Sequence, residues 1–151
     1  MESLNLKGVK VLFTEYNNAD FGSSITLDVT DDSVRTEVEK FYTENNINKG
    51  VAKIKEYTNT ETGETTKQYT IKLAEFVEVL PEGAEKTGII RGIDEVAKVA
   101  RDIKLGRGAT INIAIRPYEY NNTFGTGISA SAVAIVIVKG ADFKSAFDDL
   151  M

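Results

Sequence analysis

Arginine and tyrosine alternate along one stretch of this sequence, residues 115–129, which reads IRPYEYNNTFGTGIS. Side chains at every second position of a β-strand share one face, so Arg116, Tyr118 and Tyr120 would lie side by side. The isoleucines that alternate through residues 111–115 would then occupy the opposite face. Guanidinium groups bind phosphate, and tyrosine rings stack on bases. The stripe therefore has the chemistry to hold single-stranded nucleic acid, although tyrosine also favours strands for packing alone.

A second stripe of the same kind comes earlier in the chain, where Lys53, Lys55 and Tyr57 occupy alternate positions. They belong to the first arm of a predicted hairpin, whose polar loop reads TNTETGETT. The second arm, residues 67–79, places Lys72 on the face opposite to Tyr69. Two outward stripes of basic and aromatic side chains would form the walls of one groove. We predict that these basic and outward aromatic residues contact nucleic acid, although neither stripe is specific by itself.

Charge is distributed unevenly along the chain. The net charge is −5, which argues against a simple basic domain of the kind that binds nucleic acid. Residues 86–116 nevertheless contain seven basic side chains and only three acidic ones. Within them, Lys104 and Arg107 stand among glycines in the stretch KLGRG, and glycine lets a backbone approach a phosphate closely. We predict that these two residues neutralise backbone phosphates; the alternative is an ordinary solvated surface.

The sequence contains neither cysteine nor histidine. Their absence excludes disulfides, thiolate nucleophiles, Cys/His zinc sites and triads with an imidazole base. No glycine-rich dinucleotide motif and no Walker motif is present. Asp28, Asp31 and Asp32 come nearest to a metal-binding group, and helix capping explains them more simply. We therefore expect a protein that needs no cofactor and catalyses no reaction; a Mg²⁺-dependent enzyme built on these acids is an alternative.

Length and hydropathy indicate one intracellular domain. The chain has 151 residues, enough for a single domain with a sizeable core. It lacks a run of about 18 apolar residues, which a membrane-spanning helix needs. Its first residues, MESLNLKGVKVLF, do not resemble a signal peptide. We expect a cytoplasmic protein without membrane contact.

Apolar and polar residues alternate with strand periodicity through much of the chain. The predicted elements are strands at residues 8–14 and 25–29, a helix from Asp31 or Asp32 to about residue 44, strands at 51–57 and 67–79, a short helix at 94–103, and strands at 109–120 and 128–138. Strands in long hairpins, with one or two helices, fit a mainly β fold: a small antiparallel barrel of the OB type, whose closure removes exposed edges. The last strand is nearly all apolar, so we expect it to be buried on both faces.

The C-terminal residues differ in character from the rest. We assign residues 1–139 to the OB-like domain and residues 140–151, GADFKSAFDDLM, to an acidic tail with three acids and one lysine. A short acidic end is often only solubilising. Here two of the acids are flanked by apolar side chains, a combination suited to a partner's apolar pocket with a basic rim. The residues of this predicted partner-binding tail are Phe147, Asp148, Asp149 and Leu150.

Four short motifs follow one another between residues 105 and 151: LGRGAT, IRPYEYNN, GISASAVAIVIV and the acidic AFDDLM. In these motifs the chain resembles the phage-encoded OB-fold single-stranded DNA-binding proteins of replication and recombination. The resemblance implies a sequence-tolerant protein that coats single strands. We expect it to act without catalysis, in the host cell cytoplasm, and as a homodimer. The resemblance also implies that the acidic tail contacts replication or recombination proteins and competes with DNA for the basic groove.

A virion structural or assembly protein is the main alternative. Its apolar last strand and its aromatic stripe would then build an interface between subunits. Replacing both Tyr118 and Tyr120 by alanine separates the two interpretations. Lost DNA affinity with little lost stability indicates DNA binding, whereas broken oligomers indicate an interface.

Overall fold

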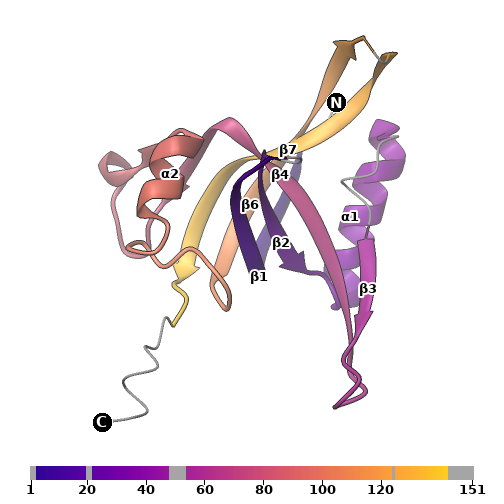
Figure 1. Ribbon diagram of the computed structural model, residues 1–151, viewed down its shortest axis with the longest axis horizontal. Coiled ribbons are helices and arrows are strands. Elements are labelled where there is room, and N and C mark those ends of the chain that lie inside the picture. The colour runs from indigo at the N-terminus through magenta and orange to yellow at the C-terminus, as the bar shows by residue number, and fades with distance from the viewer. Residues whose placement is uncertain (1–2, 20–21, 48–53, 124, 143–151) are drawn as a thin grey trace.

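A computed structural model describes residues 3–19, 22–47, 54–123 and 125–142 of the chain (Figure 1). Within these residues strands dominate, and two α-helices and one 3-10 turn connect them. The elements in chain order are β1 (Leu4–Asn18), β2 (Gly22–Asp28), α1 (Asp32–Asn45), β3 (Ile54–Thr58), β4 (Thr65–Leu80), η2 (Lys86–Gly88), β5 (Ile90–Arg91), α2 (Ile93–Val99), β6 (Thr110–Asn122) and β7 (Gly125–Lys139).

Five of the strands close into a ring. The order around it is β2, β1, β6, β7 and β4, and pairing of β2 with β4 completes the circle. Every pair in the ring is antiparallel except β4 and β7, which run parallel. In the part of the chain described, β3 and β5 each pair with β4 outside the ring. The predicted mainly β, OB-like barrel is confirmed. The parallel pair was not predicted; the chain between β4 and β7 is long enough to make the crossover that parallel strands need.

The core lies inside the ring and is built by alternation along the strands. Tyr69 and Ile71 of β4 are fully buried, and so is Ile111 of β6. Their neighbours in sequence point away from the core, because side chains of a strand alternate between its two faces. The period-two pattern predicted this inward set.

Helix α1 packs onto the barrel through Val38 and Phe41, which are both buried. It begins where the sequence predicted, because Asp31 accepts hydrogen bonds from two backbone N–H groups of the first turn. The ring of Tyr42 meets that of Tyr69 edge-on, with 5.6 Å between ring centres. These contacts fix α1 against β4 as well as against β1.

Helix α2 ends at Val99, so it is shorter than the helix predicted at residues 94–103. Val96 and Ala100 are buried, as the helical spacing predicted. Lys104 then takes a positive φ of 60°, a left-handed conformation that no helix interior contains. The chain therefore turns here, and it enters β6 through a glycine-bounded loop.

The outer face of β7 corrects one prediction. Residues 129–132 are buried, but Val136 and Val138 are 39% and 49% exposed. A barrel strand turns one face to the core and the other outward, so an apolar sequence buries both faces only where a second layer covers it. None of the described elements covers these two valines, and the prediction of a strand buried on both faces is wrong there.

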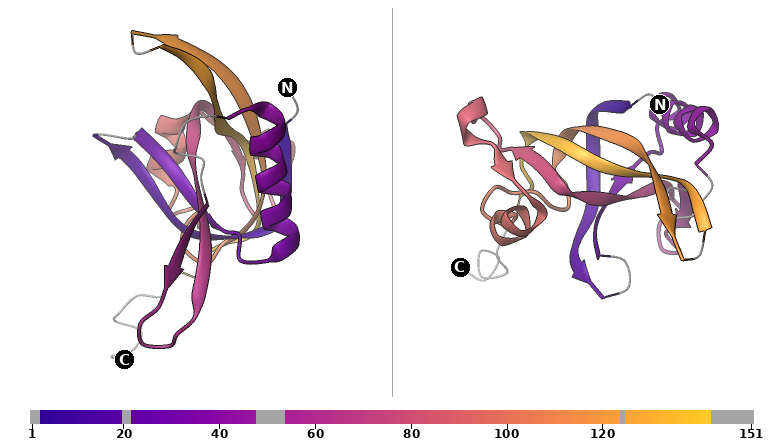
Figure 2. Two further views of the ribbon diagram at one scale, coloured as in Figure 1. Left: turned by 90° about the vertical axis from the view of Figure 1, so that its right-hand side faces the viewer. Right: turned by 90° about the horizontal axis from the view of Figure 1, so that it is seen from above.

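The two long hairpins extend beyond the ring. β6 pairs with β1 as far as Ile115, and β7 pairs with β4 from Ser131 onward. Between these points the two strands pair with each other, and we name residues 116–130 the arm. The turn of the arm and the turn of the β3–β4 hairpin point to opposite ends of the molecule (Figures 1 and 2).

Candidate nucleic-acid interface

Strand register brings Lys72 and Arg116 onto one surface. Lys72 of β4 is the partner of Ser131 in β7, and Ser131 is also the partner of Arg116 in β6. Partners in a sheet point to the same face, so the two cations flank one serine at about 10 Å, two strand spacings apart. Both side chains are exposed, whereas Ile71 beside Lys72 is fully buried. This face therefore lies on the outside of the barrel.

The same face continues along β4 to the β3–β4 hairpin. Lys55 pairs with Gln68, and Tyr57 pairs with Thr66. Gln68 and Thr66 point outward as Lys72 does, because the even-numbered side chains of β4 up to residue 72 point away from the core. Tyr57 is 58% exposed. We name this surface the β4 face: it comprises the outward side of β4, the outward side chains of the neighbouring β2 and β3, and Arg116 of β6 on the far side of β7. Lys53 lies outside the described residues.

Two threonine hydroxyls mark the middle of the β4 face. The Oγ1 atoms of Thr26 in β2 and Thr70 in β4 lie 2.8 Å apart in a hydrogen bond. Thr26 is nevertheless only 1% exposed, so side chains of the outer surface cover it. Phe13 of β1 is its partner in the sheet and is 46% exposed. The centre of this face is thus uncharged and bordered by an aromatic ring.

Sequence reasoning did not identify Phe13. Strict alternation from Val9 and Val11, both buried, would also turn Phe13 inward. The register of β1 with β2 shifts between Val11 and Phe13, and this bulge at Leu12 reverses the phase. The only signal in the sequence is a third large apolar residue, Leu12, between Val11 and Phe13, which breaks the alternation.

The two tyrosines of the arm differ in their surroundings. Tyr118 pairs with Ser129 and is 38% exposed. Tyr120 pairs with Gly127, and a Cβ at Gly127 would lie 2.3 Å from the Tyr120 hydroxyl oxygen and 2.6 Å from its ring carbon Cζ. The Tyr120 ring therefore lies across the strand in space that only glycine leaves open. Its hydroxyl is buried, so Tyr118 is the more available of the two.

Lys104 and Arg107 are not part of the β4 face. The carbonyl of Lys104 accepts a hydrogen bond of 2.8 Å from the N–H of Ala141, so its backbone holds the chain that leaves β7. The arm lies at the opposite end of β7 (Figure 1). Arg107 lies in the loop before β6 and borders a hollow with Phe13. The structure thus places the predicted basic loop residues beside β1 and the end of β7.

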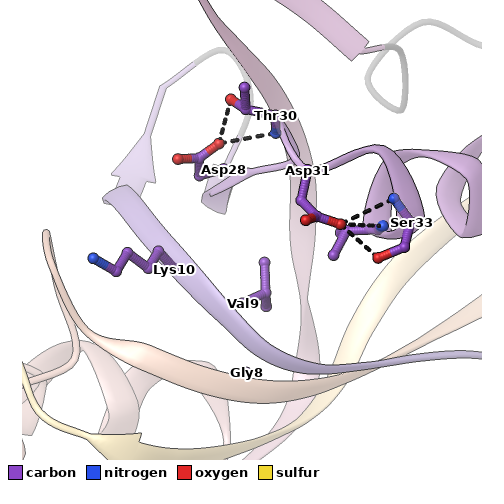
Figure 3. A pocket seen from close by; sticks show the side chains of 8 residues that line it. Gly8, Val9, Lys10, Asp28, Thr30, Asp31 and Ser33 are labelled. Carbon is purple, nitrogen blue, oxygen red and sulfur yellow. Dashed lines mark hydrogen bonds between the residues drawn. The ribbon is translucent and has the colours of Figure 1, made fainter.

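The acidic residues considered for Mg²⁺ are engaged locally. Asp28 accepts hydrogen bonds from the backbone and hydroxyl of the threonine two positions on, and Asp31 caps α1 (Figure 3). Asp28 and Asp31 border an open hollow of about 390 Å³ beside β1, while Asp32 pairs with Arg35. Hydrogen bonds, the first from the Ser33 hydroxyl, hold the pKa of Asp31 below its ordinary value. Among the described residues, no three acids are placed to share a metal ion.

Solved structures share this fold across nearly the whole chain. A C-terminally truncated form of the single-stranded DNA-binding protein of bacteriophage Enc34 superposes with a TM-score of 0.63 at 14% identity, over 93% of this chain and 87% of that one. The Enc34 protein in complex with single-stranded DNA gives 0.62 at 16% identity, over 94% and 89%. The fold is that of phage single-stranded DNA-binding proteins.

A second phage protein extends the comparison. The single-stranded DNA-binding protein gp2.5, encoded by bacteriophage T7, gives a TM-score of 0.50 at 13% identity, over 98% of this chain and 92% of that one. No protein-family model and no curated protein matches the sequence. The resemblance to phage single-stranded DNA-binding proteins is therefore confirmed in the fold. The partner-binding tail residues lie outside the described residues, and no helix within them is long and apolar enough to cross a membrane.

Proposed function

We propose that this protein binds single-stranded DNA without sequence preference, that the β4 face is its binding surface, and that it acts without catalysis. The observation that carries the proposal is the register, which aligns Lys55, Tyr57, Lys72 and Arg116 on one outward face although they come from three strands. Basic side chains that follow a backbone, with aromatic rings between them, are the pattern of sequence-tolerant single-strand binding.

The position of this face within the barrel supports the proposal. OB folds bind oligonucleotides on the face of their second and third strands, between the loop after the first strand and the loop joining the last two. In this ring those strands are β2 and β4, and the two loops are the β1–β2 turn and the turn of the arm. Lys72 lies next to the first of them, since its Cε is 3.8 Å from where a Cβ would stand on Gly22. The Enc34 neighbour has been solved with single-stranded DNA bound.

A titration with oligo-dT and with duplex DNA, at low and at moderate salt, tests the proposal. We expect binding to the single strand alone, with log K falling against log salt by about 0.7 for each phosphate contacted. Lys72→Ala should lower the steepness of that salt dependence by about 0.7, the contribution of one phosphate contact. Lys40→Ala, which removes the same charge from α1, is the matched control and should leave the slope unchanged. Absence of binding at low salt, or binding that ignores salt, contradicts the proposal.

The proposed cellular role is coating of single strands during phage replication or recombination, in the host cell cytoplasm. The acidic tail, residues 140–151, supports it, because carboxylates flanked by apolar side chains suit a docking segment for replication proteins. Gly140 and Ala141 still contact the barrel: the Gly140 N–H donates to a Glu82 carboxylate oxygen at 2.6 Å, and Ala141 is buried. A tail that acts as a docking segment would therefore extend from Asp142 onward.

We propose a homodimer as the assembled form. Val136 and Val138 on the outer face of β7 support it, together with Phe76 of β4, which is 80% exposed. Exposed apolar side chains on the outer surface of a sheet favour self-association. Sedimentation of the protein and of Val136→Lys at several concentrations tests this: the variant should be monomeric where the parent is a dimer. Large, stable assemblies without DNA affinity would instead favour the virion protein.

A further inference from the structure

A hollow of about 410 Å³ lies beside β1, between that strand, α2 and the loop before β6. Its floor is apolar, because it includes Leu105 and Ala100, which are 2% and 6% exposed. Phe13 stands at its edge, 46% exposed, and Arg101 and Arg107 contribute two guanidinium groups. We name this hollow the α2 pocket.

The charged residues that line the α2 pocket are basic, although the chain as a whole is acidic. The protein carries a net charge of −5, yet no carboxylate belongs to the residues that line this pocket, and two arginines do. An apolar floor with an aromatic edge and guanidinium groups matches a flat, apolar ring that carries a negative charge beside it. A base with its phosphate has that chemistry.

The loop that carries Arg107 is fixed rather than adaptable. The Gly108 N–H donates to the carbonyl of Val11 at 2.9 Å, and the Val11 N–H donates to the carbonyl of Ala109 at 2.8 Å. These two hydrogen bonds hold the loop against β1 immediately after Arg107. The backbone of Arg107 is therefore held beside β1, which lowers the entropy lost when a ligand binds.

The α2 pocket continues the β4 face. Phe13 is the sheet partner of Thr26, whose hydroxyl bonds to Thr70 at the middle of that face. Phe13 thus stands about 10 Å from Thr70, two strand spacings across the sheet. A strand that leaves the β4 face over β1 meets Phe13 first and the arginines next.

We propose that the α2 pocket takes one nucleotide of the bound single strand, with its base against Phe13 and its phosphate on Arg107. The proposal rests on the proposed function, since it extends the same DNA path. It makes the binding track longer than the β4 face, and it assigns a role to an aromatic residue that sequence alternation would place in the core. Arg101 lines the same pocket.

Affinities of Phe13→Ala and Arg107→Ala for a ladder of oligo-dT lengths, about 4 to 16 nucleotides, test the proposal. We expect each variant to bind the longest oligonucleotides about tenfold or more weakly than the parent, because a lost base stack or phosphate contact has that effect. Both losses should appear above the same length, since shorter strands fill the β4 face without reaching the pocket. Arg107→Ala should also lower the salt slope by about 0.7.

Matched controls are available elsewhere on the barrel. Lys86→Ala removes an exposed cation from η2, and Lys40→Ala removes one from α1; neither residue lines the pocket. Both controls should bind every length as the parent does. If Phe13→Ala and Arg107→Ala also match the parent at every length, or lose the same factor at every length, the pocket is not a separate subsite and the inference is wrong. A parent protein that binds no single strand overturns the proposed function instead. Arg107 lies on an exposed loop, so its variant keeps the test valid if Phe13→Ala unfolds.

Discussion

The two long hairpins carry nearly the same pattern in the sequence and differ in the structure. In the β3–β4 hairpin, Tyr57 stands opposite Thr66 and is 58% exposed. In the arm, Tyr120 stands opposite Gly127 and lies across the space that the glycine leaves. The cross-strand partner therefore decides what an aromatic side chain of a stripe can do. A β-branched partner keeps the ring out in solvent, whereas a glycine lets it fold down onto its own hairpin.

The hairpins also differ in what supports them. Tyr69 of β4 reaches into the core and meets Tyr42 of α1, so the β3–β4 hairpin shares its second strand with the barrel. The arm beyond Ile115 and Ser131 pairs with itself alone among the described residues. A two-stranded hairpin is marginal without such support. We infer that one hairpin is rigid because of the barrel and the other because of Tyr120 and Gly127.

The largest effect is expected in the barrel itself. Tyr69→Ala removes a fully buried ring, and we expect it to lower the free energy of unfolding by about 3–5 kcal/mol. Tyr57→Ala, an outward residue of the same hairpin, should change it by no more than about 0.5 kcal/mol. Urea denaturation of the two variants measures both. A large loss in Tyr57→Ala would contradict its assignment to an exposed binding surface.

The second-largest expected effect is a loss of DNA affinity. Tyr57→Ala and Tyr118→Ala should each weaken binding to oligo-dT by about 1–3 kcal/mol, because each removes an available ring. Tyr120→Ala should cost less, since that ring is already engaged with Gly127. Fluorescence anisotropy with labelled oligo-dT compares the three variants. An equal loss in Tyr120→Ala would mean that the ring leaves Gly127 when DNA binds.

A smaller, local effect is expected in the arm. Gly127→Val introduces a side chain into space that Tyr120 fills, so the ring must move away. Amide hydrogen exchange should speed up in residues 116–130, while the unfolding free energy of the barrel stays within about 0.5 kcal/mol. Thr126→Val places the same side chain on the neighbouring exposed position and should leave exchange unchanged. Unchanged exchange in Gly127→Val would remove the proposed role of this contact.

The smallest effect concerns alkaline pH. Burial raises the pKa of Tyr69 above its ordinary value of 10.0, and burial and the neighbouring Tyr69 raise the pKa of Tyr42. The unfolded chain ionises these phenols above pH 10.0 while the folded barrel keeps them neutral. Stability should therefore be intact below that pH and fall as the pH rises further. Tyr69→Phe should flatten this fall in a denaturation series from pH 8 to about 11; an unchanged series would show that Tyr69 does not carry it.

Most of the barrel could be predicted because its strands obey period two. The inward residues of β4 and β6 follow from the sequence pattern, and Asp31 marks the start of α1 by its capping chemistry. Pairing between distant strands is different. The register that joins Lys72 to Arg116 through Ser131 depends on a parallel pair and on a register shift between β6 and β7 after Ala114, and neither leaves a local signal.

The candidate site was predictable in its residue types and less so in its arrangement. The register places Lys55, Tyr57, Lys72 and Arg116 on one outward surface, and Tyr118 follows Arg116 along β6 into the arm. That these residues contact DNA stays a prediction. That Lys104 and Arg107 lie outside the β4 face could not be predicted, because a loop carries no periodicity. Bulges also limit what a sequence pattern can predict, because one extra residue reverses which of the following side chains point inward.

The ring closes between strands that are far apart in the sequence. Leu4 pairs with Ile115, and about half of β4 pairs with β7, the last of the described strands to be synthesised. During synthesis, which adds about 5–20 residues per second, the first half of the chain therefore emerges with unpaired strand edges. Contacts of this range also slow folding in general. We expect the nascent protein to stay open until β7 has left the ribosome, and to depend on chaperones more than its small size suggests.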